Sequence, residues 1–363
     1  MNIIHERVRQ HIVNILRAWG MADDLVQITA DAMVETDLLG VDSHGISMLM
    51  SYESRKREGK LNLAARPTIL RETPAMALVD GQAGLGHPVS VFAMNLAIDK
   101  ALKIGVAGVG VRNSHHFGAT GVYARIASKR GVIGMVTSAT RGITMVPTRG
   151  KIPVLGTNPI AFSAPAKRNR PFTLDMATTT SAANKVKVYD LNGKKMPEGW
   201  MIDGNGNGNT VTDARKGMEM MFDGSKSGGL TPVGGMEAMA SYKGYGLAMM
   251  AHILGGTLNG GSFSPLREKT QKDNDPDNIG HFFLAIDPKA FRGPGEFEND
   301  LDDVIDVMHA TPPLDPSRPV LVAGDPEAME REKRLKSGIP IPEKLDQHIR
   351  DICGRCGADY VLT

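Results

Sequence analysis

The sequence G-V-D-S-H-G occupies residues 40–45, directly after a run in which apolar residues recur at helical spacing. A second histidine segment, N-S-H-H-F-G-A at residues 113–119, follows a β-rich run and precedes another helical pattern. Both segments place histidine beside small residues in loops that leave regular structure. Histidine has an ordinary pKa near neutrality and is the usual proton carrier of enzymes. The two loops therefore predict an enzyme that moves protons.

Helical patterns surround the first segment and return near the end of the chain. Apolar residues at helical spacing predict helices over 4–19, 22–39 and 46–57, and again over 326–336 and 341–352. The first sixty residues should form a helical unit, to which helices from the far end of the chain contribute.

The middle of the chain has the character of a sheet. Short β-rich runs predict strands at 75–79, 106–111, 132–137, 160–163, 172–174, 282–286 and 320–322. Helical patterns at 89–102, 122–128 and 244–258 lie between them, and the polar segments 192–209 and 266–278 should be surface loops. We predict a mixed α+β fold with a helical, substrate-side domain from residues 1–70 and 305–363, and a mixed-sheet domain from residues 71–304.

Composition narrows the class of protein. The chain of 363 residues has a formal net charge of +2, which gives no broad basic surface for nucleic acid. Its longest apolar run, 247–258, is too short to span a bilayer, and the start of the chain lacks a secretion pattern. We expect a cytoplasmic protein without nucleic-acid or membrane partners. Cys353 and Cys356 have the spacing of a redox pair. They end a helical pattern instead of following a strand and opening a helix, which argues against a redox role.

Glycine-rich dinucleotide motifs are absent from the sequence. The nearest segments, G-V-A-G-V-G at 105–110 and K-G-Y-G at 243–246, lack the spacing of G-x-G-x-x-G, and there is no phosphate-binding G-x-x-x-x-G-K-[ST] loop. If the protein binds a dinucleotide, it does so without a Rossmann fold.

The histidines admit structural interpretations as well as catalytic ones. His44 could simply cap a turn, and at least one of His115 and His116 should be buried and hydrogen-bonded. A metal site would need a further ligand such as Asp42, and no H-E-x-x-H spacing supports it, so we predict no metal. The position of the second segment before a helix favours anionic ligands instead.

Further motifs are weak singly but distinctive together. In chain order they are D-S-H-G, N-S-H-H-F-G-A, G-T-N-P-I-A-F, L-D-M-A-T, P-V-G-G, Y-K-G-Y-G-L and G-D-P-E. From Asp42 to Glu327 this combination resembles the malate/L-lactate dehydrogenase family that lacks a Rossmann domain. Relatives in that family act on ureidoglycolate, sulfolactate, diketogulonate and cyclic imino acids.

The resemblance implies hydride transfer between NAD or NADP and C2 of a small 2-hydroxy or 2-oxo acid. It also implies a homodimer whose active site lies between the helical domain and a cofactor-binding mixed-sheet domain. His44 and His116 match the family's catalytic histidines, with Ser43 orienting His44, and Thr157 and Asn158 match positions near the substrate. The matching cofactor positions are His116, Phe117, Gly118, Thr140, Asp175, Met176, Ala177, Lys243, Gly324, Asp325 and Pro326.

Two departures from the family pattern concern the substrate. Many relatives carry Arg four positions after the D-S-H-G histidine, where it can clamp a carboxylate, but this chain has Met48. We predict Arg141 as the replacement, the alternative being that Arg141 and Arg149 are both exposed. Lys185 stands where imino-acid reductases of the family tend to carry Asp, which favours the hydroxy-acid branch.

Other functions remain open at this point. Within the family, the alternatives are a reductase of cyclic or N-substituted imino acids and a dehydrogenase of the ureidoglycolate type. Outside it, a metal-dependent hydrolase or lyase could use Asp42, His44, His115 and His116, and a non-catalytic binding protein could have kept the fold. The sequence does not separate NAD from NADP.

Overall fold

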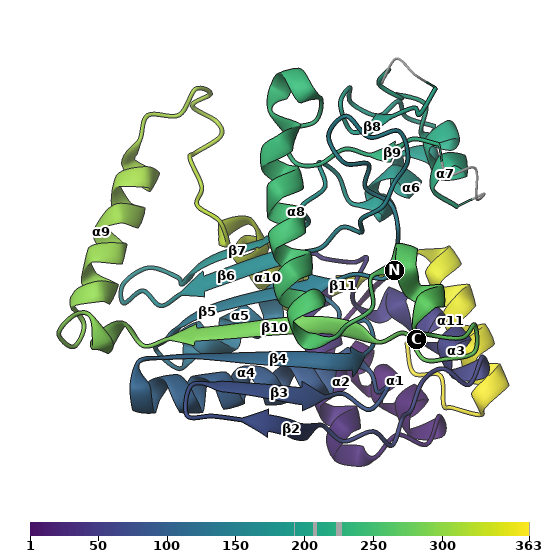
Figure 1. Cartoon of the computed structure of the whole chain (residues 1–363), viewed down its shortest axis with the longest axis horizontal. Coiled ribbons are helices and arrows are strands. Elements are labelled where there is room, and N and C mark those ends of the chain that lie inside the picture. Colours follow the sequence, from purple (N-terminus) through teal and green to yellow (C-terminus); the bar gives the residue numbers. More distant parts are fainter. Residues whose placement is uncertain (192, 206–208, 223–226, 363) are drawn as a thin grey trace.

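A seven-stranded mixed sheet forms the centre of the molecule in the computed structural model, which describes residues 1–191, 193–205, 209–222 and 227–362 (Figure 1). Its strand order is β2-β3-β4-β10-β5-β6-β7, and β3 and β4 are parallel while the other neighbours are antiparallel. The strands are β2 (Thr68–Glu72), β3 (Met76–Asp80), β4 (Val106–Ser114), β5 (Ile133–Ala139), β6 (Ile160–Ala164), β7 (Phe172–Met176) and β10 (Ile279–Ile286). The predicted mixed α+β fold is confirmed.

Helices make up most of the regular secondary structure outside this sheet in the described part of the chain. They are α1 (His5–Ala18), α2 (Asp23–Leu38), α3 (Leu49–Arg57), α4 (Gly86–Ile104), α5 (Thr120–Lys129), α6 (Ala183–Leu191), α7 (Ala214–Phe222), α8 (Ser241–Gly255), α9 (Glu296–Ala310), α10 (Asp325–Ser337) and α11 (Glu343–Cys356). Among the described residues, no helix is both long and apolar enough to cross a membrane.

The two faces of the sheet are covered by different helices. Helices α4 and α5 pack on one face, and α8 crosses the other (Figure 1). On β4, Ala107, Val109 and Val111 are buried in the core under α4. On the opposite face, a Cβ at Gly108 would lie 3.1 Å from the Phe282 ring, and one at Gly110 would lie 2.0 Å from Asn259 Oδ1. The glycines of this segment therefore admit close packing and form no nucleotide loop.

Both parts of the helical unit share one hydrophobic core. Buried side chains of α1 and α2 pack with those of α11, and the short strands β1 (Asn2–Ile3) and β11 (Ile339–Pro340) pair antiparallel. The predicted helical unit built from distant parts of the chain is present (Figure 1). The division at residues 70 and 304 stays a prediction.

A small lobe beside α8 differs from the sequence prediction. Helices α6 and α7 and the strands β8 (Met201–Ile202) and β9 (Gly229–Leu230) enclose a separate core of Met and Val side chains (Figure 1). The prediction of a loop over 192–209 is wrong at β8, and residues 192 and 206–208 lie outside the described residues. The Gly- and Asn-rich composition of this segment indicates an exposed loop, whereas Met201 in β8 is buried in the core of the lobe.

Two other predicted segments need correction. Residues 320–322 form no strand, since the backbone N–H of Val322 donates to Asp325 Oδ2 at 2.9 Å and so leads into α10. The polar segment 266–278 is only partly a surface loop, because it begins within a 3₁₀ helix (Ser264–Lys269) and ends in the buried Asp277. Cys353 and Cys356 lie on α11 as free thiols.

Candidate active site between the helical unit and the sheet

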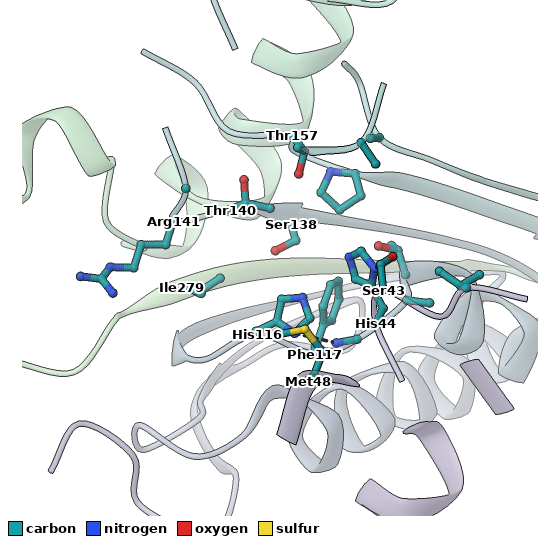
Figure 2. A pocket seen from close by; sticks show the side chains of 18 of the residues that line it. Ser43, His44, Met48, His116, Phe117, Ser138, Thr140, Arg141, Thr157 and Ile279 are labelled. Carbon is teal, nitrogen blue, oxygen red and sulfur yellow. Dashed lines mark hydrogen bonds between the residues drawn. The ribbon is translucent and has the colours of Figure 1, made fainter. Parts of the chain in front are cut away.

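A cavity of about 950 Å³ lies between the helical unit and one end of the sheet. Its walls include many of the residues that the sequence predicts for the site (Figure 2). They are Ser43, His44, His116, Phe117, Gly118, Thr140, Arg141, Thr157, Asp175, Met176 and Ala177. Predicted residues that do not line this cavity are Asn158, Lys243, Gly324, Asp325 and Pro326.

The loop that carries His44 is held by buried polar contacts. The Asp37 carboxyl, at the end of α2, accepts a hydrogen bond of 2.8 Å from the Ile46 backbone N–H. A Cβ at Gly45 would lie 1.9 Å from Asp37 Oδ1, so only glycine fits there. Arg334 of α10 binds both the Asp42 carboxylate and the Asp37 carbonyl. These contacts explain why D-S-H-G forms one fixed turn.

His44 enters the cavity from this turn. The Ser43 Oγ lies 2.6 Å from His44 Nδ1, which is the contact that an orienting role requires. Burial lowers the pKa of His44, so that its neutral form predominates near neutral pH.

His116 lies directly beside His44. The two ring centroids are 5.3 Å apart with an interplanar angle of 32° (Figure 2). Tyr52 Oη is 2.8 Å from His116 Nδ1, and the Gly118 backbone nitrogen lies 3.3 Å from the same ring nitrogen. These contacts leave Nε2 as the ring nitrogen for a substrate. Burial, together with the neighbouring histidines, holds the pKa of His116 well below its ordinary value.

Sequence reasoning missed Tyr52, although the residue lies within a predicted helix. It comes from the buried side of α3 and is 3 % exposed. The helical periodicity over 46–57 identifies the buried side of this helix, but it does not show which of its polar atoms reaches a residue of the second histidine segment.

His115 has a different environment from His116. Its Nε2 donates to the Lys60 carbonyl at 2.7 Å, and its Nδ1 lies 3.4 Å from Asp277 Oδ2. Asp42, the other suggested metal ligand, is held by Arg334. Across the described ranges, no group of three or more His, Cys, Asp or Glu side chains is arranged to hold a metal ion.

Three arginines line the cavity around a single acid. Arg141 Nη1 lies 2.8 Å from Asp277 Oδ1, with Arg55 and Arg267 close to the same carboxylate. Figure 2 shows Arg141 extending away from the two imidazoles. Arg149, by contrast, is exposed and pairs with Glu237. The sequence prediction selected Arg141 but missed Arg55, Arg267 and Asp277.

Another part of the cavity wall is formed by the start of α5 and by charged side chains. Gly118 to Gly121 line it, together with Arg125, Asp175 and Glu327. Asp175 accepts a 2.7 Å hydrogen bond from the Gly121 N–H. The Asp175 carboxylate opens to the cavity but lies deep in the protein, and this burial raises its pKa to about 6.

The predicted residues outside the cavity have structural contacts. Gly324, with φ of 103°, begins α10 where a Cβ would lie 3.2 Å from the Thr173 backbone, and this packing brings Glu327 to the cavity. Asn158 is buried, and its Oδ1 accepts from the Thr140 N–H at 3.1 Å. Lys243 is exposed on α8. A sequence motif identifies such segments without showing which of their side chains face the cavity.

Paired imidazoles and a cluster of guanidinium groups in one cavity define an enzyme that carries out acid–base chemistry on an anionic substrate. The model of the malate/L-lactate dehydrogenase family matches residues 3–350. The chain is 38 % identical over 347 residues to malate dehydrogenase from Pyrococcus abyssi, covering 95 % of this chain and 92 % of that protein. The chain belongs to the malate/L-lactate dehydrogenase family.

Solved structures agree with this family membership. Malate dehydrogenase from Entamoeba histolytica superimposes with a TM-score of 0.93, at 29 % identity, over 99 % of both chains. A Δ1-piperideine-2-carboxylate reductase from Pseudomonas syringae superimposes with a TM-score of 0.81 at 26 % identity, over 97 % of this chain and 99 % of that one. The protein is thus an oxidoreductase of 2-hydroxy acids, and its family implies a nicotinamide cofactor.

Proposed function

We propose that this protein is an NAD- or NADP-dependent dehydrogenase that transfers a hydride between the nicotinamide and C2 of a small 2-hydroxy or 2-oxo acid. The observation that carries the proposal is the pair of imidazoles, His44 and His116, 5.3 Å apart in the wall of one cavity. Two histidines from distant segments, each with its Nδ1 engaged by a hydroxyl group, are arranged to serve one reacting group.

The cavity suits a dinucleotide without a Rossmann fold. Its volume of about 950 Å³ lies at the upper end of the range for small-molecule sites, about 300–1,000 Å³. The backbone at the start of α5 and the Arg125 guanidinium would hold phosphate groups, since a helix N-terminus and a cation both favour anions. The nicotinamide, when bound, accepts or donates the hydride.

His116 is the residue that we assign to proton transfer. Removal of hydride from an alcohol carbon yields a carbonyl only if the hydroxyl proton also leaves, and a neutral imidazole must accept that proton. His116 is neutral near pH 7 because its pKa is lowered, and in the tautomer whose Nδ1–H donates to Tyr52 Oη, Nε2 has the free lone pair that accepts the proton. General base catalysis of this kind contributes about 10²- to 10⁴-fold. His44, oriented by Ser43, would hydrogen-bond the same oxygen.

The substrate carboxylate requires a cation because Met48 cannot bind it. We assign this role to Arg141, which lines the cavity with its side chain 32 % exposed. Thr157 lines the same cavity and would donate a hydrogen bond, while Asn158 acts by holding Thr140.

The hydroxy-acid function is favoured over imino-acid reduction. Lys185, at the position where the reductases tend to carry Asp, lies with its Nζ 5.2 Å from the centre of the Trp200 ring. As a lysine, Lys185 offers no carboxylate that could stabilise a protonated imine.

A homodimer is part of the proposal. The outer face of α8 leaves large apolar side chains exposed, among them Leu247, Met250 and Ile253, and the same helix carries Lys243. Burial of such a face against a second copy would remove apolar surface from water. It would also bring Lys243, which does not line the cavity of its own chain, into contact with the second copy.

The experiment is an assay of NADH and NADPH oxidation with oxaloacetate, pyruvate and a cyclic imine. We expect turnover with a 2-oxo acid and little with the imine; the reverse would favour the reductase.

His116→Ala should cut turnover by about 10²-fold or more and largely spare cofactor binding. The matched control is His348→Ala, an exposed histidine on α11. Near-normal turnover in His116→Ala would remove this residue from the mechanism.

A further inference from the structure

One wall of the cavity gathers more positive charge than a single carboxylate needs. Asp277 Oδ1 meets Arg141 Nη1 at 2.8 Å and Arg267 Nη1 at 3.4 Å, while Oδ2 meets Arg55 Nε at 3.5 Å. All four side chains line the cavity. Three guanidinium groups thus share one carboxylate. Arg267 Nη2 also donates to the Asp275 and Pro276 carbonyls, so the N–H donors left to Arg267 lie on Nε and Nη1.

Asp277 is fixed in place and stays ionised. Its side chain is only 6 % exposed, and His115 Nδ1 lies 3.4 Å from Oδ2. Burial alone would raise the pKa of Asp277, but the hydrogen bond with His115 and the charges of Arg141 and Arg55 outweigh it, so the pKa lies below its ordinary value. Because the Lys60 carbonyl in turn holds His115, the carboxylate is a rigid centre around which the arginines are arranged.

The surrounding charges leave the cluster positive. Arg55 also pairs with Glu58 at 2.8 Å, and Lys60 lies 3.4 Å from the same carboxylate. Four cations (Arg55, Arg141, Arg267 and Lys60) therefore face two carboxylates (Asp277 and Glu58), which leaves two positive charges among these six side chains. Partly buried cations without matching anions are costly, so the cluster favours a ligand that supplies negative charge.

We propose that Arg55, Arg141 and Arg267, arranged around Asp277, form a specificity site that selects substrates with a second acidic group. Asp277 sets how many negative charges this site accepts. The inference rests on the proposed 2-hydroxy-acid dehydrogenase function, within which Arg141 receives the C1 carboxylate. Arg55 and Arg267 receive the acidic group at the other end of the substrate. A monocarboxylic acid of the same length would leave one positive charge unmatched.

The first test compares two acids that differ only in the second acidic group. Malate carries a carboxylate where 2-hydroxybutyrate has a methyl group. We expect kcat/KM to be higher for malate by about 100-fold or more, because a site built for polar partners rejects an analogue that lacks them. Similar values for the two acids would overturn the inference and leave the dehydrogenase function standing. No turnover with any 2-hydroxy acid would instead refute the proposed function.

The second test removes one arginine. Arg55→Leu should lower kcat/KM for malate by about 30-fold while changing that for 2-hydroxybutyrate less than about 3-fold, since only malate loses a charged partner. The matched control is Arg292→Leu, which removes a surface arginine paired with Glu296 and Asp300. An equal loss for both acids, or no loss for malate, would contradict the assignment. If the leucine variant does not fold, Arg55→Lys tests the same point, because lysine keeps the charge without the bidentate geometry.

The third test concerns Asp277 itself. Asp277→Asn adds one net positive charge, so the ratio of kcat/KM for 2-hydroxy-3-phosphonopropionate to that for malate should rise by about 10-fold, as the phosphonate can carry one more negative charge. An unchanged ratio in a variant with a normal circular dichroism spectrum would show that Asp277 does not set the charge accepted. If this variant does not fold, the comparison of malate with 2-hydroxybutyrate in the unmodified enzyme still decides the proposal.

Discussion

Replacing Tyr52 with phenylalanine should reveal what a single hydroxyl contributes to His116. The phenol oxygen lies 2.8 Å from His116 Nδ1, and the side chain is 3 % exposed. Phenylalanine would keep the ring contacts, including the edge-on packing against His87 at 5.7 Å, and would remove only the hydrogen bond.

The size and sign of the effect follow from the contacts. Burial raises the pKa of Tyr52, so the residue stays a phenol, and its oxygen accepts from Nδ1–H when Nε2 acts as the base. A net hydrogen bond contributes about 0.5–1.5 kcal/mol, which corresponds to about 2- to 13-fold in kcat/KM. Loss of the acceptor for Nδ1–H removes a contact that favours the imidazolium, so it should lower the pKa of His116 further.

The assay is the pH dependence of kcat/KM for alcohol oxidation at saturating cofactor. Oxidation needs neutral His116, so the rate should rise as pH passes through the pKa of this residue, and in Tyr52→Phe that rise should move to lower pH. Tyr189→Phe, which alters a ring packed on Trp200 in the small lobe, is the matched control. An unchanged profile would refute the role of the hydroxyl. A loss beyond about 100-fold would indicate that Tyr52 itself exchanges the proton.

Three further predictions concern the loop, its buried acid and the carboxylate clamp. Gly45→Ala should lower the free energy of unfolding by about 3 kcal/mol in urea melts, since its Cβ meets the Asp37 carboxyl, whereas Gly246→Ala, with open space around it, should change little. Burial raises the pKa of Asp37 to about 8, above that of the unfolded chain, so stability falls as pH rises from about 4 to 8; Asp37→Asn should flatten this slope in melts at pH 5 and 8. Arg141→Ala should lower kcat/KM for the acid by about 10- to 100-fold, and an unchanged value would eliminate Arg141 as the clamp.

Local patterns were sufficient to predict most of the fold. The helical spacing of apolar residues predicts α1 and α2, and short β-rich runs predict strands such as β4 and β10, because burial on one face imposes a period on the sequence. The small lobe escaped prediction since its Met-rich core has no strong period and lies between segments rich in Gly and Asn.

The site was predictable only where its chemistry is concentrated in short segments. His44 and His116 stand out beside glycines, but Tyr52 meets His116 across 64 residues of sequence and nothing in its helix indicates that contact. Asp277 was hidden in a polar segment that resembles a surface loop. Pairings of this kind arise from the tertiary fold, and a single sequence contains no record of them.

The pairing of β1 with β11 and the grip of Arg334 on the D-S-H-G turn affect the order in which the chain can mature during synthesis. Because synthesis runs from the N-terminus, the sheet strands are made before α10 and α11. Helices α1 and α2 lack part of their shared core until α11 joins them. The contacts that hold the histidine turn are likewise incomplete until Arg334 of α10 has docked.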